Sequence, residues 1–313
     1  MQHLRLVLMG SPAIAIPGFR ALFEAGHHIA AVFTQPDKIF GRKRELKACP
    51  VAAWARQMEL RVEQPATFRK KEPRQILGDL APDAFVVTAY GRILPRSVLA
   101  IPRLGAVNLH ASLLPRWRGA SPIQAAIQAG DSETGLTTML MDVGLDTGPM
   151  LLVERIPILP TEDSPSLSQK MADISGDLLL RTLDGLAEGS IEPIQQPQEG
   201  ITFAPILGRE HGALSWTDQA LHIERSMRAF RPWPGITLPI EGGRLKILDA
   251  QLSSGDPNKA PGQVLRADGK ELIVNCTQGA LDLLRVQAPG KKAMQAIDWA
   301  RGARLDTDFR FPC

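Results

Sequence analysis

The sequence is poor in cysteine and has no long apolar runs. Its 313 residues hold only three cysteines, Cys49, Cys276 and Cys313, and these are widely spaced. They form neither a zinc-binding pattern nor a disulfide framework, so we expect no bound metal and a reducing, cytoplasmic location. No apolar run approaches the ~20 residues that a transmembrane helix needs, so no membrane partner is expected. The amino-terminal residues show no signal-peptide pattern.

The sequence also lacks a large net charge. The formal net charge at pH 7 is +3, and the surplus lies in residues 208–313, which hold 15 Lys and Arg against 12 Asp and Glu. Such a weak basic bias is compatible with a polyanionic partner and equally with none. Charge alone therefore does not indicate nucleic acid.

The glycine pattern of a dinucleotide-binding site is missing as well. Gly10 follows the first predicted strand, but the second and third glycines of the G-x-G-x-x-G pattern are absent. Pro12 stands where a backbone N–H would be needed. A nicotinamide-dependent dehydrogenase is therefore disfavoured.

What the sequence does contain is an alternation of short apolar segments and helical patterns. Apolar runs predict strands at residues 4–9, 29–33, 83–89, 106–109, 136–141 and 150–158, and helices are predicted at 13–25, 51–58 and 166–187. This alternation is typical of parallel βαβ units with both sheet faces covered. We predict an α/β, Rossmann-like catalytic domain over residues 1–189, with a mostly parallel sheet and helices on both faces.

The composition and the hydrophobic pattern change after this domain. Residues 190–207 are rich in Pro, Gln and Gly and are predicted to form a linker. Beyond them, a helix at about 217–230 precedes short strand patterns separated by turns. That spacing favours a small antiparallel, OB-like β-barrel over residues 208–313.

Two polar residues stand at the end of the strand predicted at 106–109. Asn108 and His110 flank Leu109, so the alternation of a strand puts both polar side chains on one face. Ligands of open α/β sheets lie beyond the carboxyl ends of the strands. An amide and an imidazole there suit a site that binds a developing oxyanion. Taken alone, the pair is more simply interpreted as two residues that hydrogen-bond a loop.

The residues that follow favour the functional interpretation. Ser121-Pro122 is a typical helix start, so residues 111–120 are expected to form a loop above the strand ends. A second polar centre lies in the turn at 142–148. Asp142 is interpreted as an ordinary turn residue, whereas Asp146 could orient His110, because a neighbouring carboxylate stabilises a protonated imidazole.

Long stretches of the chain resemble the methionyl-tRNA formyltransferase family, within the folate-dependent formyltransferase superfamily. The resemblance is carried by Asn-Leu-His-Ala-Ser-Leu-Leu-Pro-Arg-Trp-Arg-Gly-Ala-Ser-Pro-Ile-Gln at 108–124 and by Gly-Leu-Thr-Thr-Met-Leu-Met-Asp-Val-Gly-Leu-Asp-Thr-Gly at 135–148. Segments 32–37, 89–95, 228–234 and 289–294 are similar too. The likeness therefore runs nearly from end to end.

The resemblance implies formyl transfer from 10-formyltetrahydrofolate, with Asn108, His110 and Asp146 as the catalytic residues and no metal. It places contacts with the reduced folate on two loops and one strand end: Ser112, Leu113, Leu114 and Pro115; Ala89, Tyr90 and Gly91; and Met139, Met141 and Gly144. Ser112 is not expected to be a nucleophile, because the G-x-S-x-G elbow is absent. The expected acceptor is the amino group of methionyl initiator tRNA, used in translation initiation by a monomeric enzyme.

The assignment of tRNA as the acceptor depends on basic residues outside this centre. The family's basic loop corresponds to Gly41–Lys47, with Arg42, Lys43 and Arg44, although Lys43 replaces a usual glycine. Lys291 and Lys292 are candidates in the barrel. Two alternatives stay open: a formyltransferase acting on a sugar-nucleotide amine, and a non-catalytic protein that binds folate or RNA.

Overall fold

The computed structural model describes residues 2–40 and 45–313. Contacts divide the chain into two units. The first comprises Met1–Ile123, Ser132–Ile158 and Ser166–Pro205, and the second comprises Gln124–Asp131, Leu159–Pro165 and Ile206–Cys313. Two short segments that precede residue 206 therefore belong to the second unit.

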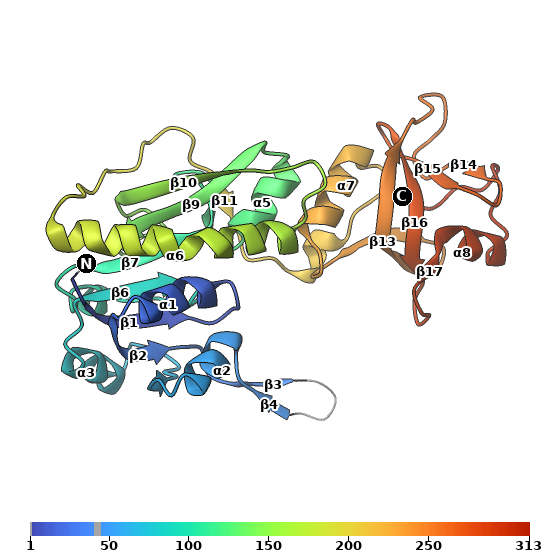
Figure 1. The fold of residues 1–313 in the computed structure, drawn as a ribbon. Helices are drawn as coiled ribbons and strands as arrows, with labels where there is room; N and C mark the ends of the chain where they lie inside the picture. Colours follow the sequence, from blue (N-terminus) through green and yellow to red (C-terminus); the bar gives the residue numbers. More distant parts are fainter. Residues whose placement is uncertain (1, 41–44) are drawn as a thin grey trace. The chain divides into compact units, whose positions relative to one another are not determined.

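The first unit is built on a seven-stranded mixed sheet (Figure 1), whose strands are β1 (Arg5–Gly10), β2 (His28–Phe33), β5 (Val62–Glu63), β6 (Ala84–Thr88), β7 (Ala106–His110), β9 (Glu133–Leu140) and β10 (Met150–Pro157). The strand order is β10-β9-β7-β6-β1-β2-β5. The five strands from β5 to β7 are parallel to one another, as predicted. Both β9 and β10 are antiparallel to their neighbours, which makes the sheet mixed.

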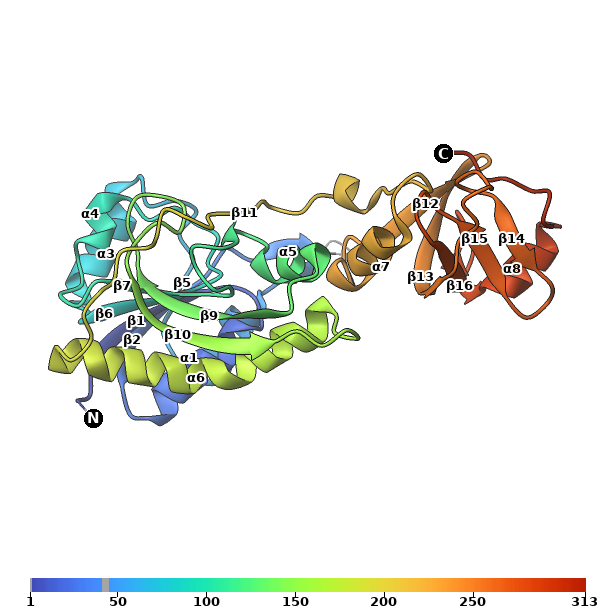
Figure 2. The same cartoon turned by 90° about the horizontal axis from the view of Figure 1, so that it is seen from above.

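Helices cover both faces of this sheet, as predicted (Figure 2). They are α1 (Ala15–Glu24), α2 (Pro50–Gln57), α3 (Lys71–Asp79), α4 (Arg96–Leu99) and α6 (Ser164–Glu188). Most of α5 (Pro122–Ala129) belongs to the second unit. On one face, Leu77 of α3 and Val98 of α4 join the buried cluster formed by strand residues such as Phe85. On the other, α6 lies along the sheet, where Thr182 and Thr138 of β9 share a hydrogen bond of 2.9 Å.

Two short sheets accompany the main one. β3 (Lys38–Phe40) pairs with β4 (Glu45–Lys47), and β8 (Arg118–Gly119) pairs with β11 (Phe203–Ala204). The second of these pairs is parallel and joins the segment after His110 to the predicted linker. The linker is therefore hydrogen-bonded to the first unit at β11.

The second unit contains an antiparallel sheet with helices beside it. Its elements are η1 (Arg209–Gly212), α7 (Ala220–Ala229), β12 (Ile236–Ile240), β13 (Gly243–Ser253), β14 (Val264–Ala267), β15 (Leu272–Asn275), β16 (Ala280–Gln287), β17 (Met294–Gln295) and α8 (Ala296–Gly302). The order is β12-β13-β16-β15-β14, and β17 also pairs with β16. Register shifts in β13 and β14 are the irregularities that increase twist and let a sheet curl. The predicted antiparallel β-domain is confirmed.

No helix in the part of the chain that the structure describes is both long and apolar enough to cross a membrane.

Candidate active site

Asn108 and His110 lie at the carboxyl end of β7, in the interior of the sheet. Both are buried, with 8% and 5% of their surface exposed. Across the antiparallel β7–β9 pair, Asn108 is opposite Met139 and His110 is opposite Thr137. Because opposite residues of such a pair share a face, the amide and Met139 lie side by side, as do the imidazole and Thr137.

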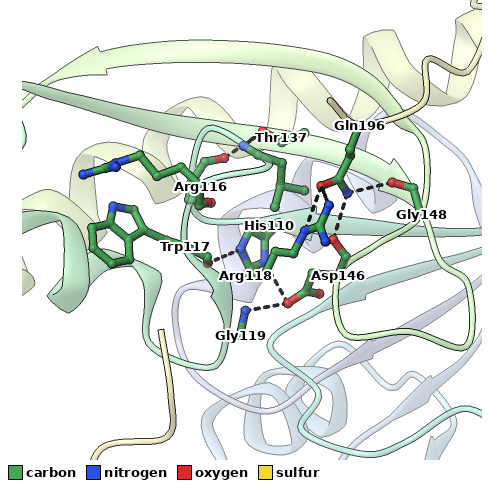
Figure 3. A network of polar contacts seen from close by, with 11 residues as sticks. His110, Arg116, Trp117, Arg118, Gly119, Thr137, Asp146, Gly148 and Gln196 are labelled. Atoms are coloured by element: carbon green, nitrogen blue, oxygen red, sulfur yellow. Dashed lines mark hydrogen bonds and ion pairs between the residues drawn. The ribbon is translucent and has the colours of Figure 1, made fainter. Parts of the chain in front are cut away.

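The imidazole of His110 faces an oxygen at each of its nitrogens (Figure 3). Its Nε2 lies 2.9 Å from the carbonyl oxygen of Trp117, and its Nδ1 lies 3.7 Å from Oδ2 of Asp146. A carbonyl oxygen only accepts hydrogen bonds, so Nε2 must carry a proton to bond it. The ring is thus held between a main-chain acceptor and a carboxylate.

Asp146 is fixed to the loop that follows β7. Its Oδ2 accepts a hydrogen bond of 2.8 Å from the backbone N–H of Gly119. Its φ of +51° lies in the left-handed region, which non-glycine residues seldom adopt. Asp142 has a local role in the same turn, since its carboxylate accepts from the N–H of Gly144 at 2.9 Å and from Oγ1 of Thr147 at 2.7 Å. The structure therefore brings Asp146, and not Asp142, to His110.

The loop carrying Ser112, Leu113, Leu114 and Pro115 is tied down by hydrogen bonds at its base. Ser112 is fully buried, and its Oγ donates to the carbonyl of Arg116 at 2.5 Å. Thr137 of β9 donates to the carbonyl of Ser112 at 2.7 Å and accepts from the N–H of Leu114 at 3.3 Å. The Ser112 hydroxyl is thereby used within the loop. The sequence does not reveal this role of Thr137, since a threonine inside a strand pattern indicates only β-structure.

The segment Ala89–Gly91 follows β6, the parallel neighbour of β7, so it emerges at the same sheet edge as His110. Ala89 and Gly91 both have positive φ, +48° and +68°. The Tyr90 side chain points into the core against Phe68, and its burial raises the pKa of its hydroxyl. Its carbonyl accepts from Nε2 of Gln35 at 3.0 Å. What this segment presents at the sheet edge is mainly backbone.

The remaining predicted folate contacts, Met139, Met141 and Gly144, do not all lie near His110. Met139 lies beside Asn108, but the backbone N–H of Met141 bonds the carbonyl of Ala106, at the opposite end of β7 from His110. Met141 is partly buried against the apolar cluster beneath the sheet. Gly144 is exposed in its turn. Among these residues, only Met139 lies next to the polar pair of β7.

The predicted tRNA contacts do not all fall in the described residues. Arg42, Lys43 and Arg44 lie outside them. Lys291 and Lys292 are exposed in the second unit, between β16 and β17.

Two further residues of the centre lie outside every sequence prediction of the site. Arg118 and Gln196 are both buried, 7% and 6% exposed, and hydrogen-bond each other beside Asp146. Arg118 lies in the loop predicted at residues 111–120, and Gln196 lies in the predicted linker. Among the described residues, no group of three or more His, Cys, Asp and Glu side chains is placed to hold a metal ion.

An amide, an imidazole and a carboxylate gathered at the end of a central strand are groups that an acyl-transferring enzyme uses. Comparison with known proteins identifies the class. Residues 6–183 match the formyl transferase family, and residues 207–304 match the formyl transferase C-terminal domain. The chain belongs to the formyl transferase family.

Several solved structures share this fold at low sequence identity. A variant of HypX from Aquifex aeolicus superposes with a TM-score of 0.64 at 15% identity, over 96% of this chain and 49% of that one. The present chain therefore spans about half the length of HypX. WlaRD, a sugar 3N-formyl transferase solved with dTDP and 5-N-formyl-THF, gives 0.64 at 15% identity, over 93% of this chain and 100% of that one. An N-formyltransferase from Helicobacter canadensis was solved with folinic acid and dTDP-3-aminofucose. It superposes with a TM-score of 0.64 at 16% identity, over 89% of this chain and 98% of that one.

Proposed function

We propose that this protein transfers the formyl group of 10-formyltetrahydrofolate to the free amino group of methionyl initiator tRNA. The observation that carries the formyl-transfer part is the approach of Asp146 to His110 at the end of β7, with Asn108 buried on the same face of that strand, inside a chain of the formyl transferase family. The reaction forms a bond from nitrogen to the formyl carbon and breaks the bond from that carbon to N10 of the folate.

Each of the three side chains has a part in this exchange. The Asn108 amide and the imidazole of His110 stabilise the oxyanion that develops when the neutral amine attacks the formyl carbon. Asp146 orients His110 through Nδ1, and it helps to move the proton released by the amine to the departing folate nitrogen, directly or through water. In this reaction, His110 redirects its Nε2 proton from the Trp117 carbonyl to the oxyanion.

Support for a folate donor comes from the loops around the centre and from the similar proteins. Apolar residues and exposed backbone line the sheet edge at Ala89–Gly91 and at Leu113–Pro115, as a flat heterocycle with backbone partners requires. Among the similar proteins, HypX has been solved with tetrahydrofolic acid and WlaRD with 5-N-formyl-THF. We therefore take the donor to be a reduced folate.

Support for a tRNA acceptor comes from the end-to-end resemblance and from basic residues. Arg42, Lys43 and Arg44 form a basic run in the sequence, and Lys291 and Lys292 are exposed on the second unit. Lysine and arginine side chains of this kind bind a phosphate backbone by displacing its counterions.

A sugar-nucleotide amine is the second candidate acceptor. It is favoured by the sugar N-formyltransferases among the similar structures, which match this chain over nearly the whole of both chains. In that case the C-terminal domain would not be required to bind nucleic acid.

An assay with each acceptor in turn distinguishes the two candidates. The full-length protein is given 10-formyltetrahydrofolate with either methionyl initiator tRNA or a dTDP-linked amino sugar, and the formylated product is identified by mass. The proposal expects formylmethionyl-tRNA and no more than background formylation of the sugar. Formylation of the sugar alone would overturn the tRNA assignment while leaving formyl transfer intact.

A further inference from the structure

The predicted linker is hydrogen-bonded to the first unit along its length, and three of its residues bond the segments around the centre. Ile194 and Met150 exchange two backbone hydrogen bonds of 2.8 and 2.9 Å. The Gln196 side chain bonds the loop that carries Asp146. Thr202 bonds the backbone N–H groups of Trp117 and Arg118, at 2.8 and 2.9 Å. The segment therefore holds both loops that frame His110.

Gln196 is the residue of this segment that reaches the centre itself (Figure 3). Its Nε2 donates to the carbonyl oxygens of Asp146 and Gly148, each at 2.8 Å. Its Oε1 accepts from Nε and Nη2 of Arg118, at 3.0 and 2.7 Å. Rotating the amide by 180° would set donors against donors and the oxygen against two carbonyls. The four contacts thus fix one orientation of this buried side chain.

The same segment also fixes the carboxylate of Asp146, by way of Gly119. Gly119 has a φ of +124°, and a Cβ at that position would lie 2.4 Å from the carbonyl oxygen of Ala204 in β11. Only glycine permits β11 to lie this close, and the N–H of Gly119 is the group that donates to Oδ2 of Asp146. The linker therefore acts on both the main chain and the side chain of Asp146.

We propose that Gln196 is a positioning residue for formyl transfer: it holds the left-handed backbone of Asp146 so that the carboxylate faces Nδ1 of His110. Left-handed backbone at a non-glycine residue is unfavourable and persists only where surrounding contacts enforce it. The two carbonyl hydrogen bonds from Gln196 are such contacts. The inference rests on the formyl-transfer chemistry proposed above, and not on the identity of the acceptor.

Gln196→Glu is the most informative variant. A glutamate has nearly the same shape and strengthens the bond to Arg118, so the protein should fold. Its carboxylate has no N–H to give to Asp146 and Gly148 and repels their carbonyl oxygens. Gln196→Ala removes all four bonds and is the second variant. Gln195→Glu and Gln195→Ala are matched controls, because the neighbouring Gln195 is exposed.

The kinetic test is carried out in the presence and absence of the Asp146 carboxylate. We expect Gln196→Glu to lower kcat about 10- to 100-fold with little change in KM for 10-formyltetrahydrofolate, since misplacement by about 1 Å has this effect. In the Asp146→Asn background, the same change should cost less than about threefold, because residues that act through one group are not additive. The proposal would be overturned if Gln196→Glu lowered kcat by the same factor in the Asp146→Asn background as in the wild-type protein. It would also be overturned if Gln196→Glu lowered the kcat of the wild-type protein no more than Gln195→Glu does.

A second measurement needs no turnover. The ring nitrogen signals of His110 in the free protein report its surroundings and can be recorded by NMR. We expect Gln196→Glu to shift these signals in the direction that Asp146→Asn shifts them, and Gln195→Glu to leave them unchanged. His110 signals that respond to Asp146→Asn but not to Gln196→Glu would overturn the positioning role. If the wild-type protein formylates no acceptor, the proposed function fails, whereas this measurement still decides the role of Gln196.

Discussion

Two buried amides hold loops in the two units of this protein, and they differ in what surrounds them. Gln196, in the first unit, bonds two main-chain carbonyls and a guanidinium beside Asp146 and His110. Asn275, in the second unit, accepts from the N–H of Asp256 at 3.1 Å and donates to the carbonyls of Asp256 and Lys259 at 3.0 and 2.7 Å. Asn275 is 2% exposed, and these contacts are all with main chain.

The comparison separates two uses of the same chemical group. A buried amide must have its hydrogen bonds satisfied wherever it lies, and loops of main chain satisfy it well. At Asn275 the result is a stable loop over residues 255–260. At Gln196 the loop that is held carries a carboxylate next to an imidazole, so holding the loop also sets the geometry of reactive groups. Burial of a polar side chain alone therefore does not distinguish structure from function.

The largest effect is expected at Asn108, in the first of these regions. Asn108→Ala should lower kcat for formyl transfer about 100- to 1,000-fold, because it removes one donor to the oxyanion. Folate binding and thermal stability should change little. Stopped assays of formyl transfer measure kcat, and fluorescence titration with a reduced folate measures folate binding. A kcat within threefold of wild type would remove Asn108 from the proposed chemistry.

The next largest effect is expected at Asn275, and it concerns stability. Asn275→Ala removes a buried amide and leaves part-buried main-chain groups of residues 256 and 259 without that partner, so the free energy of unfolding should fall by about 1–3 kcal/mol. The kcat of the folded protein should stay unchanged. Urea denaturation and a formyl-transfer assay check this, with the exposed Asn258→Ala as control. A specific loss of kcat in the stable fraction would break the distinction between the two amides.

A smaller effect is expected on the surface of the second unit. Replacing Lys291 and Lys292 by Gln should weaken tRNA binding several-fold. It should also reduce the slope of log K against log salt by about 1 for each phosphate that is no longer neutralised. Lys70 and Lys71, an exposed adjacent pair in the first unit, serve as the control replacement. Equal slopes for the two double variants would show that this face of the second unit does not track a phosphate backbone.

The smallest effect concerns pH and a histidine away from the centre. Burial lowers the pKa of His27, whose Nδ1 accepts from the N–H of Leu4 at 3.1 Å and so requires the neutral ring. The unfolded chain then binds more protons below about pH 6.5, so this group reduces stability as pH falls through that value. His27→Gln should flatten the fall in urea midpoint between pH 7 and pH 5.5. The exposed His28→Gln should leave it as in wild type; equal curves for all three proteins would contradict the account.

Much of the fold follows from patterns that the sequence displays. Short apolar runs for buried strands and a period of 3.6 for helices are local properties, so the predicted bounds of β1, β2, β6 and β7 lie near the observed ones. The direction of β9 and β10 is not predictable in this way, because an apolar strand has the same pattern whether its neighbour is parallel or antiparallel. The side-chain face shared by Asn108 and His110 is predictable, since it too depends on a local pattern.

Other parts of the centre depend on contacts between distant residues. Gln196 lies 50 residues after Asp146, in a Pro- and Gln-rich segment whose composition indicates only a linker. Nothing local marks it as buried, because its contacts are with Arg118, Asp146 and Gly148, which are distant in the sequence. The burial of Arg118 is equally hard to predict, since nothing in the local sequence distinguishes it from the exposed Arg116.

We propose that His110 and its partners transfer a formyl group to methionyl-tRNA. An experiment that follows isotope-labelled formyl from 10-formyltetrahydrofolate into charged initiator tRNA, in a single turnover, compares wild-type protein with His110→Ala. We expect labelled formylmethionyl-tRNA from the wild-type protein and a rate about 100- to 1,000-fold lower from the variant, with folate still bound. Unlabelled tRNA from the wild-type protein, or transfer by His110→Ala at the wild-type rate, would contradict this proposal.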